Sequence, residues 1–326
     1  WSASWQTAAT NDTASMEIKM APGTRGFTLT RRRFLSVAAT VGIIGPATTA
    51  QYAMARTLTP FRVLEPVPKV LEPVPDVIEQ VIPKAGMPAG ITFKDSIQQL
   101  IAAGVIDPDK YRASAKELPA WVERLFHASS DDPVVFTEAT APYLIDLLWA
   151  IGLSNRAAFN ENSPINTLSI PSYASTGGWT FGRQQNGYVY FNKVQVVSLT
   201  PEQQKMVLKV AKTTYRPCCN NSTFYQDCNH GSALLGLLEM AASQGATLEG
   251  LYRCALTANS YWFPDNYAKT AFYFSHFYRE AWLDIEPRII LSADYSSLSG
   301  WESNVNSRLR RANVTLPGIS NEQQGC

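Results

Sequence analysis

The chain has 326 residues, of which 45% are hydrophobic and 17% are charged, and its formal net charge is +1. This near-zero charge argues against a nucleic-acid-binding protein, because neutralising phosphates requires a concentrated surface of Lys and Arg. The aromatic content of 11% is typical of a well-packed globular protein and argues against intrinsic disorder. A chain of this length can bury a core large enough to fold without a disulfide or a metal.

The first 55 residues are interpreted as an N-terminal extension that ends in an export signal. Residues 30–35 read Thr-Arg-Arg-Arg-Phe-Leu, the pattern of a twin-arginine signal, and a modest apolar stretch follows over residues 36–50. This stretch is too short and too broken by Gly and Pro to span a bilayer stably, which takes about 20 apolar residues. Ala53 and Ala55 supply the small residues of a cleavage site, so we expect the mature protein to begin near Arg56.

This signal predicts export by the twin-arginine pathway to the periplasm or the cell exterior, with no membrane span left after cleavage. Because that pathway carries proteins that are already folded, often with a cofactor in place, it favours a protein that binds a cofactor. We expect residues 1–15 to precede the native start, since Met16 and Met20 lie closer to the signal.

A proline-rich segment follows the predicted cleavage site and covers residues 56–90. Its residues 63–69 read Val-Leu-Glu-Pro-Val-Pro-Lys, and residues 70–76 repeat this pattern almost unchanged. Prolines at this density fix φ and remove backbone donors, so we expect neither a helix nor a central strand. The segment is predicted to be an extended, polyproline-like arm, which serves either as a spacer or as a binding site for a protein partner.

The remaining chain is predicted to be mainly α-helical, with a single helical domain over residues 91–316 and a flexible tail over 317–326. Thr200 begins one helix clearly, because Pro201 follows it and Gln203 stands where a capping box requires Gln or Glu. Apolar spacing and capping residues predict helices over 93–103, 117–127, 137–153, 200–214, 231–243 and 247–259, and from Pro264 onward.

Residues 155–197 interrupt this helical pattern and are rich in Asn, Ser, Gly and aromatic residues. A loop of this length is uncommon unless it acts as a lid or a binding loop. We predict a long irregular insertion, with a short hairpin between Gly187 and Val197 as the place for any β-structure.

One cluster of residues could carry chemistry. Cys218, Cys219, Cys228 and His230 all fall in the short connection between two predicted helices, so they can converge without help from the rest of the fold. Three thiols and an imidazole match the ligands of a Cys₃His zinc site, and soft thiolates suit Cu(I) or an iron–sulfur cluster equally well. The leading hypothesis is therefore a metal-binding site formed by these four residues, with the identity of the metal open.

Two other interpretations of the cluster stay open at the level of sequence. In an oxidising compartment, Cys218, Cys219, Cys228 and Cys254 could form two disulfides, which would make the chain a stapled binding or assembly module. The chain could instead be a thiol enzyme, in which a neighbouring histidine activates a cysteine. The residues available for that chemistry are Cys228 or Cys219 as nucleophile, His230 or His276 as base, and Asp227 or Asn229 to orient the base. The third histidine, His127, is expected to lie near a helix end beside Asp131 and Asp132, with no functional role.

Several of these segments also resemble a family of uncharacterised microbial proteins. The resemblance spans roughly residues 95–275 and is carried by residues 102–108, 148–153, 174–179, 218–231 and 259–264. The most distinctive of these reads Cys-Cys-Asn, then Asp-Cys-Asn-His-Gly. The resemblance implies that these segments belong to one domain, and it implies no activity or cofactor.

Overall fold

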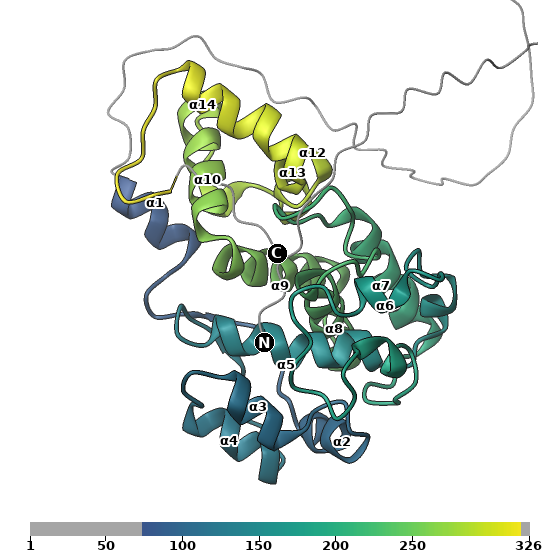
Figure 1. Ribbon diagram of the computed structural model, residues 1–326. Helices are drawn as coiled ribbons and strands as arrows, with labels where there is room; N and C mark the ends of the chain where they lie inside the picture. The colour runs from purple at the N-terminus through teal and green to yellow at the C-terminus, as the bar shows by residue number, and fades with distance from the viewer. Residues whose placement is uncertain (1–73, 321–326) are drawn as a thin grey trace, which may run out of the picture. The chain divides into compact units, whose positions relative to one another are not determined.

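Residues 74–320 are described by a computed structural model, and all of them belong to one unit of the chain that begins at Thr59. This part of the chain is mainly α-helical, which confirms the predicted fold class (Figure 1). The predicted export signal, most of the proline-rich arm and residues 321–326 lie outside the described residues.

The helices differ widely in length, and five of the first ten exceed three turns. The α-helices are α1 (Val74–Val81), α2 (Ser96–Ala102), α3 (Pro108–Ser114), α4 (Ala120–His127), α5 (Ala141–Ser154), α6 (Ile170–Tyr173), α7 (Pro201–Thr213), α8 (Asn229–Ser243), α9 (Leu248–Trp262), α10 (Pro264–Tyr278), α11 (Pro287–Ile290), α12 (Ala293–Ser296), α13 (Leu298–Trp301) and α14 (Ser307–Arg311). Short 3₁₀ helices are η1 (Ala158–Asn162), η2 (Gly187–Tyr190) and η3 (Trp282–Asp284), and η4 (Glu302–Asn306) is π-helical.

Helix α8 is the central element of the domain, and it packs most closely against α5. The contact is made at Gly152 of α5 and Gly236 of α8, where the two backbones touch. A Cβ atom on Gly152 would lie 1.9 Å from the carbonyl oxygen of Ser232, and one on Gly236 would lie 2.4 Å from the carbonyl oxygen of Leu148. Only glycine fits at these two positions, so the sequence itself dictates how close the two helices come.

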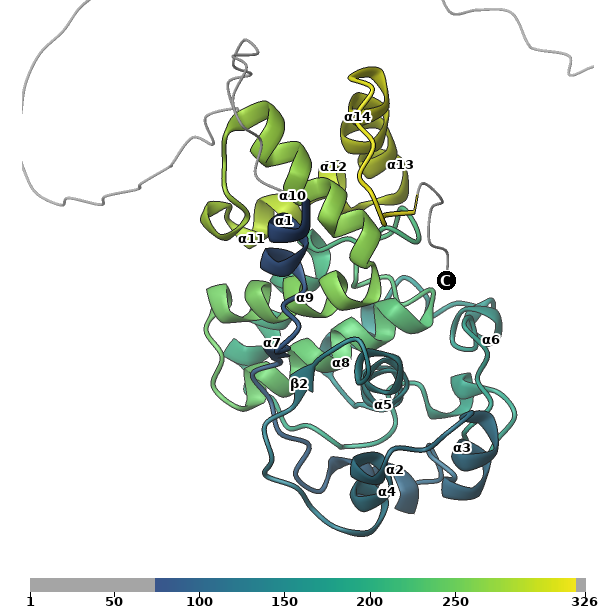
Figure 2. The same ribbon diagram turned by 90° about the vertical axis from the view of Figure 1, so that its left-hand side faces the viewer.

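The other helices surround this pair. Helices α7 and α9 also pack against α8, while α2, α3 and α4 gather on the side of α5 (Figures 1 and 2). Helix α10 and the short helices α12 to α14 lie beyond α9 in both views, and Figure 2 shows α11 beside α10. Because α8 is apolar on all its faces, this enclosure buries nearly its whole length. None of the described helices is both long and apolar enough to cross a membrane.

The capping signals at the start of α7 are confirmed. The Thr200 hydroxyl accepts a hydrogen bond from the Gln203 amide at 3.3 Å, and the Gln203 side chain accepts one from the Thr200 amide at 2.8 Å. Pro201 takes the first helical position, where a missing N–H costs no hydrogen bond.

The expectation that residues 56–90 contain no helix is wrong for their second half, while the expectation of no central strand is not contradicted, since β1 is an edge strand. Residues Val74–Val81 form α1, and Met87–Pro88 form the strand β1. The prolines do not prevent this helix because Pro75 stands in its first turn and Pro83 follows its end, so neither removes a hydrogen bond from its middle. Helix α1 packs against α10 and η3, so this half of the arm is part of the helical domain.

The predicted hairpin between Gly187 and Val197 is also wrong. That stretch contains the 3₁₀ helix η2, and its one strand-like contact is an isolated bridge between Asn155 and Val194. The sheet of the described chain pairs β1 with β2 (Val135–Phe136) in antiparallel register. Apart from the short helices η1 and α6, the rest of the insertion is irregular, as predicted, and it is packed: Trp179 is buried, and its ring lies 5.0 Å from that of Trp149 in α5.

Candidate metal centre

The candidate site lies where α8 begins. Cys228 is the N-cap residue of this helix, and His230 is its second residue. The chain between α7 and α8 folds back on itself, since the Thr223 amide donates to the Thr214 carbonyl at 2.8 Å. This reversal brings Cys218, which lies early in the connection, next to Cys228 at its end.

Three of the four predicted ligands come together. The sulfur atoms of Cys218 and Cys228 are 4.0 Å apart, and these sulfurs and a ring nitrogen of His230 all lie within 4.8 Å of one another. Two thiolates on a tetrahedral zinc ion, each bonded at about 2.3 Å, would be about 3.8 Å apart. The two sulfurs are therefore about 0.2 Å further apart than a shared zinc ion requires, and about twice as far apart as in a disulfide bond of about 2.05 Å.

Cys219 lies beside this group without joining it. Its sulfur is 3.8 Å from the carbonyl oxygen of Asn221 and 4.0 Å from a carboxylate oxygen of Asp227. The contact with Cys218 lowers the pKa of Cys219, but the contact with Cys228 and burial outweigh it, so the pKa is raised. This raised pKa favours the thiol form of Cys219, which lies next to the three converging ligands.

Arg216 is the residue of this site that the sequence analysis missed. Its side chain is fully buried, a position that a charged group takes only when it is paired. The guanidinium donates to the Cys228 sulfur at 3.3 Å, to the carbonyls of Asn221 and Tyr225 at 3.2 Å each, and to the Asp227 carboxylate. It thus fixes both ends of the connection and places a positive charge against the Cys228 sulfur.

The electrostatics and the sequence around Arg216 agree with this role. Burial by itself would lower the pKa of Arg216, but the negative groups of Cys228, the neighbouring cysteines and Asp227 raise it well above its ordinary value. Gly231 makes room for the guanidinium, because a Cβ atom there would lie 2.7 Å from Arg216 Nη2. The glycine that follows His230 is therefore required by the buried arginine.

His230 is held by aromatic packing. Its ring lies 4.6 Å from that of Phe263 and 5.9 Å from that of Trp262, at the junction of α9 and α10. Its Nδ1 atom is buried and has no hydrogen-bond partner among the residues that the structure describes. A buried polar atom without a partner is rare and calls for an explanation, and an ion bound between this ring and the two sulfurs would supply one.

The other residues considered at the sequence level lie elsewhere. His276 is on α10, thirteen residues after Phe263 and so about 20 Å further along the helix axis, which makes the proposed pairing with Cys228 as a base wrong. Cys254 is on α9, with its sulfur facing Gly90, and does not belong to the group of three. His127 ends α4 as predicted, but its partner is Glu123, at 2.9 Å.

Searches of known protein families, of curated proteins and of solved structures find no match to this chain. The resemblance over residues 95–275 therefore stays a prediction, and the chemistry of the site rests on its own geometry. That geometry offers two sulfurs and one imidazole nitrogen, a set that could hold a metal ion.

Proposed function

We propose that the protein binds one zinc ion through Cys218, Cys228 and His230. The observation that carries this proposal is the convergence of two sulfurs at 4.0 Å with a ring nitrogen, all within 4.8 Å. Sulfur and imidazole ligands are the ones zinc takes in proteins.

Charge supports a divalent ion over a monovalent one. The buried Arg216 and its partner Asp227 carry one positive and one negative charge, which cancel. Binding requires both cysteines to be thiolates, so the ligands add two negative charges. A divalent ion brings the sum to zero, whereas Cu(I) would leave one uncompensated negative charge in a largely buried site.

The number of sulfurs argues against an iron–sulfur cluster. Clusters with two or four irons are usually held by four protein ligands, most of them thiolates. The described arrangement brings together two sulfurs and one histidine, with Cys219 turned toward Asp227. Cys219, the fourth ligand predicted from the sequence, lies outside the group of atoms that are all within 4.8 Å of one another.

Three protein ligands leave one position on a tetrahedral ion for water or another small ligand. Cys228 is buried, but Cys218 and His230 are partly exposed, so the fourth position can face solvent. Zinc sites with three protein ligands and an open position are typically catalytic, whereas structural sites are closed by four. We infer an exchangeable zinc ion that acts in catalysis or transfer.

We further propose that this zinc protein works outside the cytoplasm, after twin-arginine export. The support is the sequence pattern of residues 30–55, with arginines, apolar stretch and cleavage site in order. Export of a folded protein would let the zinc site form before its cysteines meet an oxidising compartment.

Cobalt(II) substitution tests the site directly, because cobalt reports its own coordination. We expect metal-free, reduced protein to take up one Co(II) per chain, with strong visible bands of tetrahedral geometry and near-ultraviolet bands of thiolate-to-cobalt charge transfer. Zinc should displace the cobalt and abolish both sets of bands.

Variants separate the possible ligands. C218S and C228S should each weaken the charge-transfer bands and H230A should weaken metal binding, while C254S, which removes a thiol outside the group, should leave the spectrum unchanged. The proposal fails if reduced protein binds no cobalt, or if peptide mapping of protein purified anaerobically, without added reductant, finds Cys218 and Cys228 joined as a disulfide. That second outcome would favour the stapled binding module.

A further inference from the structure

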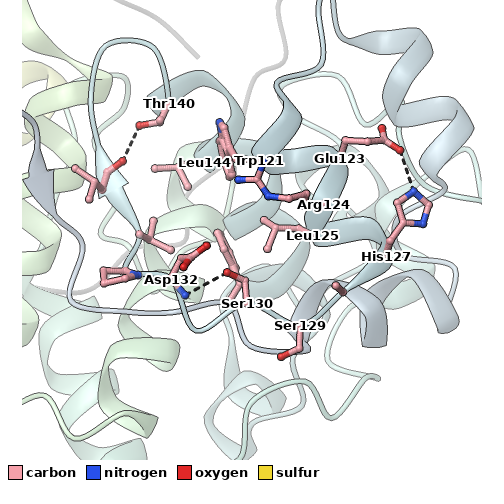
Figure 3. Close-up of a pocket in the computed structure, with 15 residues that line it drawn as sticks. Trp121, Glu123, Arg124, Leu125, His127, Ser129, Ser130, Asp132, Thr140 and Leu144 are labelled. Atoms are coloured by element: carbon pink, nitrogen blue, oxygen red, sulfur yellow. Dashed lines mark hydrogen bonds and ion pairs between the residues drawn. The ribbon is translucent and has the colours of Figure 1, made fainter.

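A second feature of the molecule, separate from the cysteine site, is a cavity between α4, the loop that follows it and the start of α5. Its volume is about 550 Å³, within the range of about 300–1,000 Å³ that is typical of small-molecule sites. Figure 3 shows Trp121, Arg124 and Leu125 projecting from α4, and Leu144 projecting from α5.

The walls of this cavity are apolar and firmly held. Phe93, Leu125, Val134 and Leu144 are buried core residues that line it, and the half-buried Trp121 covers one side. The loop is tied to the chain before α2 by backbone hydrogen bonds: Lys94 and Ser130 exchange two of them, at 2.8 and 3.0 Å, and Val134 donates to Ile91 at 2.9 Å. Because these hydrogen bonds fix its walls, the cavity is preformed in the absence of a ligand.

Most polar groups of the lining are already committed to protein partners. Glu123 pairs with Arg112 at 2.6 Å and with His127 at 2.9 Å. The Thr140 hydroxyl donates to the Val135 carbonyl at 2.7 Å, and the Ser130 hydroxyl accepts from the Asp132 amide at 3.2 Å. These groups therefore have little capacity left for a ligand.

Arg124 is the lining's cation without a protein partner among the described residues. Its side chain is exposed, and within the described part of the chain its guanidinium has no ion pair or hydrogen bond. Arg124 and Trp121 stand one turn apart on α4, so both belong to the face of the helix that borders the cavity. An uncommitted cation next to an apolar cavity is suited to a ligand with an apolar body and one anionic group.

We propose that this cavity binds an amphipathic monocarboxylate, with its hydrocarbon body against Trp121 and Leu144 and its carboxylate on Arg124. A guanidinium can bind a carboxylate through two parallel hydrogen bonds, which fixes the ligand's orientation. Asp132, on the loop across from α4, narrows the class further because its negative charge repels a second anionic group (Figure 3). The site thus selects monocarboxylates over dicarboxylates.

Calorimetric titration of the full chain with three matched probes tests this assignment. The probes are 4-phenylbutyrate, 4-phenylbutanol and 4-phenylbutylamine, which share one apolar body and differ only in the charge of the end group. We expect the carboxylate to bind at least tenfold more tightly than the alcohol, and the amine to bind more weakly than either.

Three variants complete the test. R124M should reduce the affinity for the carboxylate to that for the alcohol, while R311M, which removes an exposed arginine from the last turn of α14, should leave it unchanged. A128W should abolish binding of all three probes, because Ala128 is an exposed residue of the lining and an indole there fills the cavity without disturbing the core. Equal affinity for the three probes, full binding by R124M, or full binding by a folded A128W protein would each overturn the proposal.

Discussion

The α5–α8 pair and the connection that carries the cysteines are neighbours in the fold but are stabilised by different forces. The helix pair depends on shape: two glycines let the backbones touch, and apolar side chains fill the surroundings. The connection between α7 and α8 has little regular structure and depends on charge, because one buried guanidinium gathers its carbonyls, its carboxylate and a sulfur.

The two regions also handle a buried ionisable group in opposite ways. Arg216 stays charged and is paired. Glu239, fully buried on α8, is instead driven toward its neutral form, because burial raises its pKa well above the ordinary value and the Asn155 amide offsets this only in part. The connection can therefore hold a charged ion, whereas the core around α8 excludes charge.

The largest effect is expected from removing the charge that organises the connection. Arg216→Met keeps most of the side-chain volume but leaves the largely buried Asp227 carboxylate with the Asn221 amide and no positive charge beside it. Breaking one half of a buried ion pair typically costs about 3–5 kcal/mol of unfolding free energy. Urea denaturation of the metal-free protein measures this cost.

A surface ion pair provides the control for that measurement. Arg253 and Glu249 are paired at 2.6 Å on α9, but both side chains are largely exposed. Arg253→Met should therefore cost less than about 1 kcal/mol. Similar losses for R216M and R253M would mean that Arg216 does not organise the connection.

The next largest effect is expected where the two helices touch. Gly152→Ala places a methyl group into the backbone of α8, and overpacking of this kind costs about 1–3 kcal/mol or more. The matched change Gly250→Ala, on α9, meets no atom closer than 3.4 Å and should stabilise the helix by up to about 1 kcal/mol. If G152A melts at the same temperature as the wild type, the close contact between α5 and α8 is not as described.

The effect of Glu239 on stability depends on pH. Its pKa is raised in the folded protein, so the folded state keeps a proton that the unfolded chain releases above its ordinary pKa of about 4.3. Stability from this group is thus complete below the ordinary pKa and falls as pH rises above it. Glu239→Gln should flatten this slope between pH 5 and pH 7.

The wild type has to be compared with E239Q because a second buried carboxyl group also lowers the stability as pH rises. Burial raises the pKa of Asp146 to about 7, so Asp146 also destabilises the fold as pH rises toward 7. The contribution of Glu239 is therefore the difference between wild type and E239Q in how the free energy of unfolding changes with pH. Parallel stability curves for the two proteins would show that Glu239 is ionised in the folded state.

The regular parts of the fold were predictable because their signals are local. Thr200, Pro201 and Gln203 define the start of α7 within four residues, and the structure confirms each role. The α1 helix was missed because proline content was counted without regard to position. The hairpin was predicted from Gly187 and its neighbours, but this stretch turns as the 3₁₀ helix η2 while it packs against the core.

The site was predictable only in part, because only some of its residues lie close together in the sequence. The clustering of Cys218, Cys228 and His230 is visible in the sequence, since the connection is short. The position of Cys219 and the burial of Arg216 depend on tertiary contacts that no local pattern encodes. One usable signal existed: Arg216 and Asp227 are the only charged residues between Thr214 and His230, which could have indicated an ion pair.

The central claim is that Cys218, Cys228 and His230 hold a divalent metal ion, and metal content tests it most directly. Protein prepared anaerobically from the cytoplasm is analysed for bound metals and for thiols that react before and after a chelator removes the metal. The account predicts close to one zinc per chain, with two thiols that become reactive only after chelation. A zinc content near zero, with Cys218 and Cys228 recovered in one disulfide-linked peptide, would contradict it.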